Sequence, residues 1–150
     1  MRFEAGNIST LVTASAGAPL VAIRAPATER CALRELGVTL IAATSTLLGL
    51  ARATTISVTP GTTIAGQAKH PLAPASGTLL VSSWGTVPVI PANFFRQIVL
   101  PAAIGAGFIW TWPADDPLIV GNGVAIGEIC IANLVAVAPS LFRYYAVWED

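Results

Sequence analysis

The sequence predicts an all-β protein, a single antiparallel β-sandwich or jelly roll of about eight to ten strands covering residues 1–150. Three observations lead to this class. Short apolar runs alternate along the whole chain with Pro, Gly, Ser, Thr and Asn, which end strands and form turns. Val, Ile and Thr are frequent, whereas the helix formers Glu, Lys and Gln are rare. No stretch has the length and period of a crossover helix, so parallel strands are not expected.

The opening of the chain is expected to be extended. Residues 3–13 lack helical periodicity and belong to an N-terminal segment, about residues 1–18, that leads into the sandwich. The apolar run 20–24 follows as a strand. This strand is expected to end before Pro26, because proline lacks the N–H that a ladder needs.

Alternation identifies the next strand. In residues 31–41, Leu36, Val38 and Leu40 alternate with Gly and Thr, so one face of this strand is expected to be buried. Residues 46–53 form another apolar run after a short link of Ala, Thr and Ser. Such a short link favours an antiparallel hairpin, so these two strands are expected to pair with each other.

Turn residues divide the rest of the chain. Pro60-Gly61 marks a turn, and the most polar stretch, residues 62–76, is expected to be an exposed loop with one short strand. Asp116-Pro117 and Asn122-Gly123 mark two further turns. The apolar runs between these turns give the remaining expected strands, which are 78–84, 95–100, 107–112, 118–120, 127–137 and 141–148.

The composition is apolar without a membrane span. Hydrophobic residues make up 54% of the chain and charged residues 11%, against about 25% charged in typical domains. The longest uncharged stretch, residues 97–114, is interrupted by Pro101, Gly105, Gly107 and Pro113, so no membrane partner is expected. The net charge of zero argues against a nucleic-acid partner. The apolar surplus instead predicts burial against other copies of the chain or a larger assembly.

The titratable residues show no catalytic pattern. The single histidine, His70, lies in the polar loop, and nothing in the sequence supplies the partners of a catalytic triad. Asp115 and Asp116 precede a proline and fit a turn, with a loop calcium site as the alternative. No enzyme activity, catalytic residue, metal or cofactor is therefore expected. Cys31 and Cys130 are expected to be buried free thiols, or a disulfide if their strands are neighbours.

Aromatic and basic side chains within the apolar runs are the candidates for an interaction surface. The aromatic residues pack in the core, cover a subunit interface or stack on a sugar. The arginines, Arg24 and Arg52 among them, need partners where they are buried. Intersubunit pairs with glutamate, or protection of exposed strand edges, are the two explanations. The interface candidates are Trp84, Phe108, Trp110, Trp112, Tyr144, Tyr145, Trp148, Arg34, Arg96 and Arg143.

Short phrases spread over most of the chain resemble small virion proteins of tailed bacteriophages. They are residues 19–26, 31–38, 48–52, 96–101, 109–112, 117–120 and 144–150. The resemblance implies a jelly-roll protein of the capsid surface, made in the host cytoplasm, that decorates or cements the phage head. Its implied partners are further copies of itself, as a trimer at a local symmetry axis, and the lattice of the major capsid protein. The alternative is a tail or head-fibre module that recognises a host glycan or protein. The resemblance carries over no catalytic residue.

Overall fold

The computed structural model describes residues 1–9 and 13–150, and in these residues every regular element is a β-strand. The all-β prediction is thus confirmed. In the same residues, no helix is long and apolar enough to cross a membrane. The fourteen strands are β1 Arg2–Ile8, β2 Ala18–Ala25, β3 Ala32–Leu40, β4 Thr46–Arg52, β5 Val58–Pro60, β6 Thr63–Ala65, β7 Gln67–Ala68, β8 Leu79–Val81, β9 Trp84–Thr86, β10 Arg96–Leu100, β11 Gly107–Thr111, β12 Leu118–Ile119, β13 Gly127–Asn133 and β14 Phe142–Glu149.

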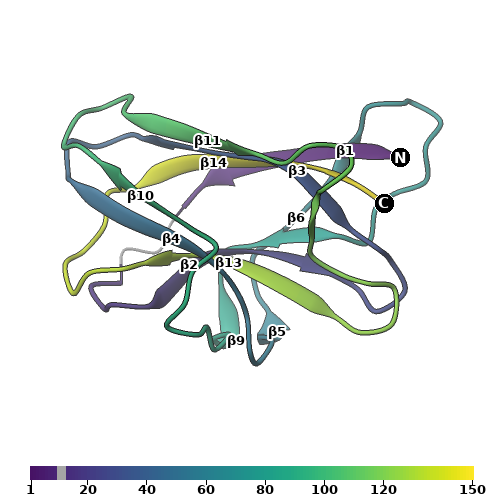
Figure 1. Cartoon of the computed structure of the whole chain (residues 1–150), viewed down its shortest axis with the longest axis horizontal. Coiled ribbons are helices and arrows are strands. Elements are labelled where there is room, and N and C mark those ends of the chain that lie inside the picture. Colours follow the sequence, from purple (N-terminus) through teal and green to yellow (C-terminus); the bar gives the residue numbers. More distant parts are fainter. Residues whose placement is uncertain (10–12) are drawn as a thin grey trace.

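The eight strands of five residues or more are connected as a jelly roll (Figure 1). Each pairs antiparallel with its counterpart from the other end of the series: β1 with β14, β2 with β13, β3 with β11 and β4 with β10. Sheet A has the order β11-β3-β14-β1-β7, with β12 also on β3, and sheet B has the order β10-β4-β13-β2-β8-β6. This is the connectivity of a long antiparallel ribbon folded over itself into two facing sheets.

The predicted hairpin between residues 31–41 and 46–53 is wrong. Both segments are strands, but β3 lies in sheet A and β4 in sheet B, so the link between them crosses the sandwich. The link is held at this crossing because the Ser140 hydroxyl donates to the Ala42 carbonyl oxygen at 3.0 Å. The Ser140 N–H donates in turn to Thr46 Oγ1 at 2.9 Å. Four extended residues span about 13 Å, enough to join sheets that pack about 10 Å apart, so link length alone does not select a hairpin.

The core lies between the two sheets and follows the predicted alternation. Leu36, Val38 and Leu40 are all buried on the inner face of β3. The aromatic part of the core stacks Phe3 of β1 on Trp148 of β14, with ring centroids 6.2 Å apart. Neighbouring strands of sheet A therefore share one aromatic contact at the end where the chain begins and ends.

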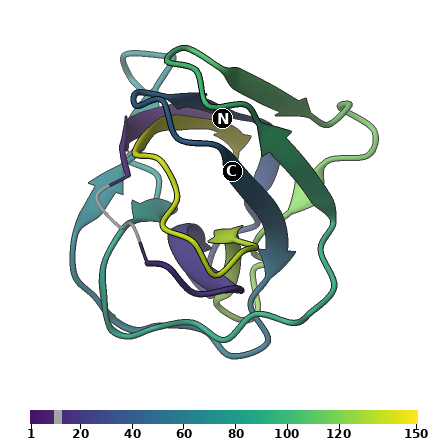
Figure 2. The same ribbon diagram turned by 90° about the vertical axis from the view of Figure 1, so that its left-hand side faces the viewer.

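The two sides of the sandwich differ, and this difference positions the candidate site. On one side, β6 belongs to sheet B and β7 to sheet A, and the single residue Gly66 joins them, so the chain itself closes this side. On the other side, the edge of sheet B is β10 and the edge of sheet A is β11, followed by the two-residue β12 on the same strand β3, and the described residues place no strand between the two edges. In Figure 2, the dark green β10 and β11 lie on one side of the molecule, and the teal segment that contains β6 and β7 lies on the other. The side bounded by β10 and β11 is called the open side below.

The polar stretch 62–76 contains two short strands, β6 and β7, where one was expected, and its remaining residues are mostly exposed. The run 78–84 is likewise divided, because β8 pairs within sheet B while β9 pairs with β5 in a separate ribbon.

The two cysteines are free and buried, as expected, and they lie in different clusters. Cys31 is part of the core between the sheets, whereas Cys130 packs with Ala22 and Val81 in a second, smaller cluster, against which Trp84 also packs. Burial raises the pKa of the Cys31 thiol to about 12. Burial also raises the pKa of the Cys130 thiol, so both thiols are protonated parts of the packing at neutral pH.

Candidate functional site

The open side gathers exposed apolar side chains that no part of the described chain covers. Five of the fourteen large apolar residues that are exposed in the described residues lie within residues 95–109, where Arg96 is the sole charged residue. We call them the open-side patch: Phe95, 48% exposed, Val99, 65%, Ile104, 73%, Phe108, 43%, and Ile109, 53%. Four of these five residues belong to the uncharged stretch 97–114.

Three of the five residues lie on the two edge strands, Val99 on β10 and Phe108 and Ile109 on β11, and the other two lie just before β10 or in the link between the strands. Val99 and Gln97 alternate with the inward-facing Ile98 and Leu100 on β10. On β11, Trp110 is buried on the inner face, and Phe108 contacts it edge to face with ring centroids 5.8 Å apart. Phe108 thus packs against a core ring while part of its own ring stays exposed on the open side.

A hollow of about 360 Å³ lies between the two edge strands. Its lining combines Arg96 and Gln97 of β10 with residues of β11 from Phe108 to Thr111. The Arg96 side chain, one of the predicted interface candidates, is exposed and lines this hollow. The lining thus combines charged, polar and aromatic residues.

The backbone of β11 also has bonding capacity on the open side. The Leu40 N–H donates to the Ala106 carbonyl oxygen at 2.7 Å, and the Trp112 N–H donates to the Arg34 carbonyl oxygen at 2.9 Å. Because an antiparallel ladder alternates, the even-numbered residues of β11 bond to β3 and the odd-numbered ones face away from it. Ile109, in the middle of the strand, therefore directs its N–H and C=O to the open edge. Such an edge can pair with a strand of another chain.

The predicted aromatic candidates divide between core and surface. Trp110, Tyr144 and Trp148 are buried within the sandwich and belong to the core, which was one of the three interpretations. Trp84 and Trp112 are half-buried, and each packs against one of the two clusters. Phe108 lies in the open-side patch, and the half-buried Tyr145 lies on the outer face of sheet A.

The arginines are paired within the chain where they are partly buried, so the intersubunit Arg–Glu explanation does not apply to them. Arg34 donates to Glu149 Oε2 from Nε at 3.0 Å and from a terminal nitrogen at 2.6 Å. Arg24 lies opposite Glu128 in the β2–β13 ladder, with 3.9 Å between their charged atoms. Sequence alone could not supply these pairs, because they depend on strand register.

The remaining arginine candidates, Arg96 and Arg143, are exposed. Arg96 lies on the edge strand β10, whereas Arg143 lies on β14, which is flanked by β1 and β3. Only Arg96 is therefore placed to protect a strand edge from unwanted pairing.

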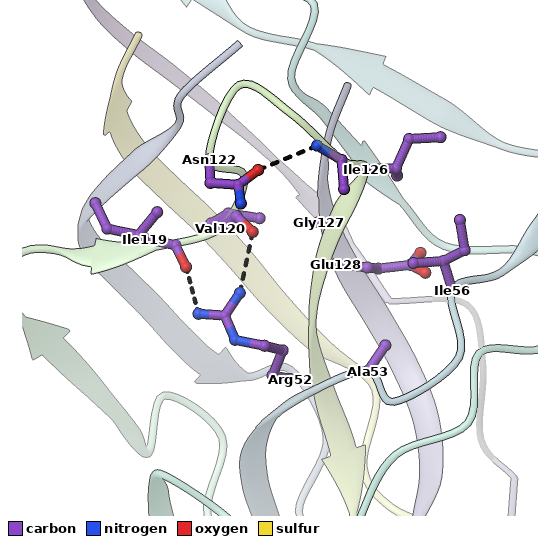
Figure 3. Close-up of a pocket in the computed structure, with 10 residues that line it drawn as sticks. Arg52, Ala53, Ile56, Ile119, Val120, Asn122, Ile126, Gly127 and Glu128 are labelled. Atoms are coloured by element: carbon purple, nitrogen blue, oxygen red, sulfur yellow. Dashed lines mark hydrogen bonds between the residues drawn. The ribbon is translucent and has the colours of Figure 1, made fainter. Parts of the chain in front are cut away.

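A second hollow, of about 340 Å³, lies at one end of the sandwich between β4 and the β12–β13 link (Figure 3). Its polar groups are already used by the chain. The Arg52 guanidinium donates to the carbonyl oxygens of Ile119 and Val120, and partial burial lowers the pKa of Arg52. Glu128 accepts the Ser57 N–H at 2.6 Å and the Ser57 hydroxyl at 2.8 Å. These bonds tie loops to strands and use the charged side chains of the hollow within the chain itself.

The sequence candidates for acid–base or metal chemistry lie apart from one another. His70 is exposed, and its Nδ1 accepts the Leu72 N–H at 3.3 Å within the loop. Asp115 and Asp116 are exposed in the turn before β12, where the Asp116 N–H donates to the Pro113 carbonyl oxygen at 3.3 Å. Among the described residues, no three His, Cys, Asp or Glu side chains are grouped to hold a metal ion.

The site best defined by geometry is therefore a surface and not a cleft: an apolar patch, a hollow and an available strand edge, all on the open side. Compared with family models, with curated proteins and with solved structures, the chain matches none of them.

Proposed function

We propose that the protein is a structural virion protein of the decoration or cement type, which assembles through its open side. The observation that carries the proposal is the asymmetry of the sandwich. One side is closed by the chain, and the other exposes Phe95, Val99, Ile104, Phe108 and Ile109 around an available strand edge. A surface of this composition is characteristic of interfaces between subunits.

The energetics favour a repeated contact over an isolated one. Full burial of a Val, Ile or Phe side chain contributes about 1.5–3 kcal/mol, and the five patch residues are already partly buried in the single chain. Association costs about 4–15 kcal/mol in lost translation and rotation, so the patch alone supports a modest affinity. In a closed trimer, each subunit makes two contacts, and the ring gains stability from closure.

The link to a virion rests on the fold and on the resemblance together. Jelly rolls form capsid domains as well as lectins, so the fold alone does not choose a function. Two of the phrases that resemble phage virion proteins, residues 96–101 and 109–112, lie on or beside the open side. In this role, the protein binds the assembled lattice of the major capsid protein and not its separated subunits. Binding of this kind stabilises the lattice by mass action.

Two measurements test the proposal. Sedimentation equilibrium of the purified chain is expected to give a trimer, and a monomer at every concentration would contradict assembly through the open side. The second measurement compares phage particles with and without the protein for loss of DNA on heating. Particles that lack it are expected to release DNA at a lower temperature, and equal resistance would refute the cement role.

A further inference from the structure

The outer face of sheet A, which faces away from the core, carries an aromatic ring between two glycines. Gly6 of β1, Tyr145 of β14 and Gly37 of β3 lie side by side in register across three neighbouring strands. Glycines on both sides leave the ring free to lean toward either neighbour. The contacts of Tyr145 determine which glycine it covers.

Tyr145 leans toward β3 and is fixed there. A Cβ placed on Gly37 would lie 2.1 Å from Cε1 of Tyr145, so the ring rests directly on that glycine. Its hydroxyl donates to Glu35 Oε1 at 2.6 Å, which holds the ring in this position. Covering Gly37 is a packing role, since an aromatic ring compensates for a missing side chain in a sheet.

The same orientation leaves Gly6 uncovered. A hollow of about 320 Å³ lies over it, lined by Glu4, Ala5, Gly6, Gln67 and Tyr145. Glu4 and Gln67 lie opposite each other in the β1–β7 ladder, and the Lys69 ammonium is 3.2 Å from the Glu4 carboxylate. The hollow is thus a small polar basin with an aromatic wall and a floor without side chains. Its volume is near the lower end of small-molecule sites, which are about 300–1,000 Å³.

The chemistry of the lining selects the class of ligand. The carboxylate of Glu4 accepts hydrogen bonds, the Gln67 amide both donates and accepts, and the Tyr145 ring offers an apolar surface. Lys69 balances the charge of Glu4, so the basin has no net charge to attract an ion. A molecule with hydroxyls that donate and accept, and with an apolar C–H face, meets each of these groups. We propose that the hollow over Gly6 binds a neutral sugar ring, with Tyr145 against its C–H face.

This inference does not rest on the proposed assembly role, because the hollow is on the face of sheet A and the open-side patch is on the opposite edge from β7. Saturation-transfer NMR with glucose, galactose and N-acetylglucosamine at millimolar concentration tests it directly. The wild-type protein is expected to transfer magnetisation to the C–H protons of at least one of these sugars. Absence of transfer to all three overturns the proposal.

Single substitutions test whether the sugar binds in the hollow over Gly6. Tyr145→Leu removes the ring and is expected to weaken binding about tenfold. Tyr145→Phe keeps the ring but loses the hydroxyl that fixes it to Glu35, and is expected to weaken binding less than Tyr145→Leu does. Gln67→Leu, an exposed position on a two-residue strand, removes the amide and is expected to weaken binding without unfolding the protein. Arg143→Gln, on the same strand as Tyr145 but outside the lining, is the matched control and keeps wild-type binding.

Two results would oppose the assignment. Unchanged sugar binding in both Tyr145→Leu and Gln67→Leu places the sugar elsewhere on the protein. Binding of tetramethylammonium, with no binding of the three sugars, shows that the basin is a cation site formed by the Tyr145 ring and the Glu4 carboxylate. Circular dichroism of each variant confirms that a loss of binding is not a loss of fold. The trimer measurement is independent of all these outcomes.

Discussion

Gly66 lies so close to the indole of Trp148 that a Cβ at position 66 would be 2.3 Å from Cζ2 of that ring. Gly66 is the residue that carries the chain from β6 in sheet B to β7 in sheet A, and Trp148 is fully buried in sheet A. The closed side of the sandwich therefore depends on a contact that leaves no room for a side chain.

Gly66→Ala is expected to destabilise the fold by about 1–3 kcal/mol, because the new methyl group must displace a ring that has no free space. For a chain of this length, each kcal/mol lowers the melting temperature by about 2–4 °C. Thermal unfolding followed by circular dichroism measures the shift. Gly85→Ala is the control, since its nearest contact would be Thr59 Cβ at 3.3 Å. Equal melting temperatures for the two variants would show that the closed side adapts freely.

Ile109→Lys tests the open side without disturbing the core. Ile109 is 53% exposed in the middle of β11, and a lysine there places a charge within the open-side patch, on the strand with the available edge. Edge strands that carry a lysine resist pairing with other chains. The variant is expected to sediment as a monomer with the melting temperature of an isolated subunit. Val124→Lys, at an exposed loop position, is expected to remain a trimer. Trimers in both variants would place the interface elsewhere.

The sequence predicted the strands and their buried faces, but it did not predict correctly which strands pair with each other. Alternation at Leu36, Val38 and Leu40 predicted the buried face of β3 because side-chain burial has a period of two. The same pattern says nothing about which sheet a strand joins, and so β3 and β4 were wrongly paired. Pairing between strands that are far apart in the sequence depends on how the whole antiparallel ribbon folds over itself. It is therefore known only when all eight long strands are placed.

The candidate surfaces show the same limit. The apolar composition of the whole chain predicted burial against another surface, but it did not say where that surface lies. Exposed apolar residues are found on and beside β10 and β11 only because the topology makes these two strands the edges of their sheets. The hollow over Gly6 could not be predicted, because Glu4 and Gln67 come together only through the register of β1 with β7.

The buried carboxylate Glu128 is expected to be one of the most sensitive positions of the fold. It is 1% exposed and accepts two hydrogen bonds from Ser57, while the Arg24 guanidinium donates to the Ser57 hydroxyl at 2.6 Å. Glu128→Ala leaves the Ser57 N–H and hydroxyl without their acceptor and Arg24 without its ion-pair partner. The variant is expected to lose about 3–5 kcal/mol in the free energy of unfolding. Urea unfolding measures this loss.

The double variant Arg24→Met with Glu128→Leu separates pairing from packing. Replacing both charges with apolar side chains removes the buried charge along with its partner, so it is expected to be less destabilising than Glu128→Ala alone. A double variant that is less stable than Glu128→Ala would instead mean that Ser57 and its loop need the ionic pair itself. Arg143→Gln, an exposed arginine on β14, is expected to leave the stability within about 0.5 kcal/mol of wild type.

The two tyrosines of the chain allow the Tyr145–Glu35 contact to be followed in solution. Burial, together with the hydrogen bond to the Glu35 carboxylate and the charge of that group, raises the pKa of Tyr145 to about 12, and burial raises the pKa of Tyr144 as well. The folded protein is therefore expected to show little phenolate absorbance near pH 10, where both side chains ionise once the chain is unfolded in urea.

The sign of the linked stability follows from the direction of these shifts. A phenol whose folded pKa lies above its unfolded value favours folding fully below the unfolded pKa, near 10, and this contribution is lost as the pH rises toward 12. Glu35→Gln removes the charge beside the phenol, so one tyrosine is expected to ionise closer to pH 10 while the fold persists by circular dichroism. Asp116→Asn, in a distant turn, is expected to leave the titration unchanged. If Glu35→Gln also leaves it unchanged, the carboxylate does not hold the Tyr145 ring over Gly37, and the hollow over Gly6 loses its fixed aromatic wall.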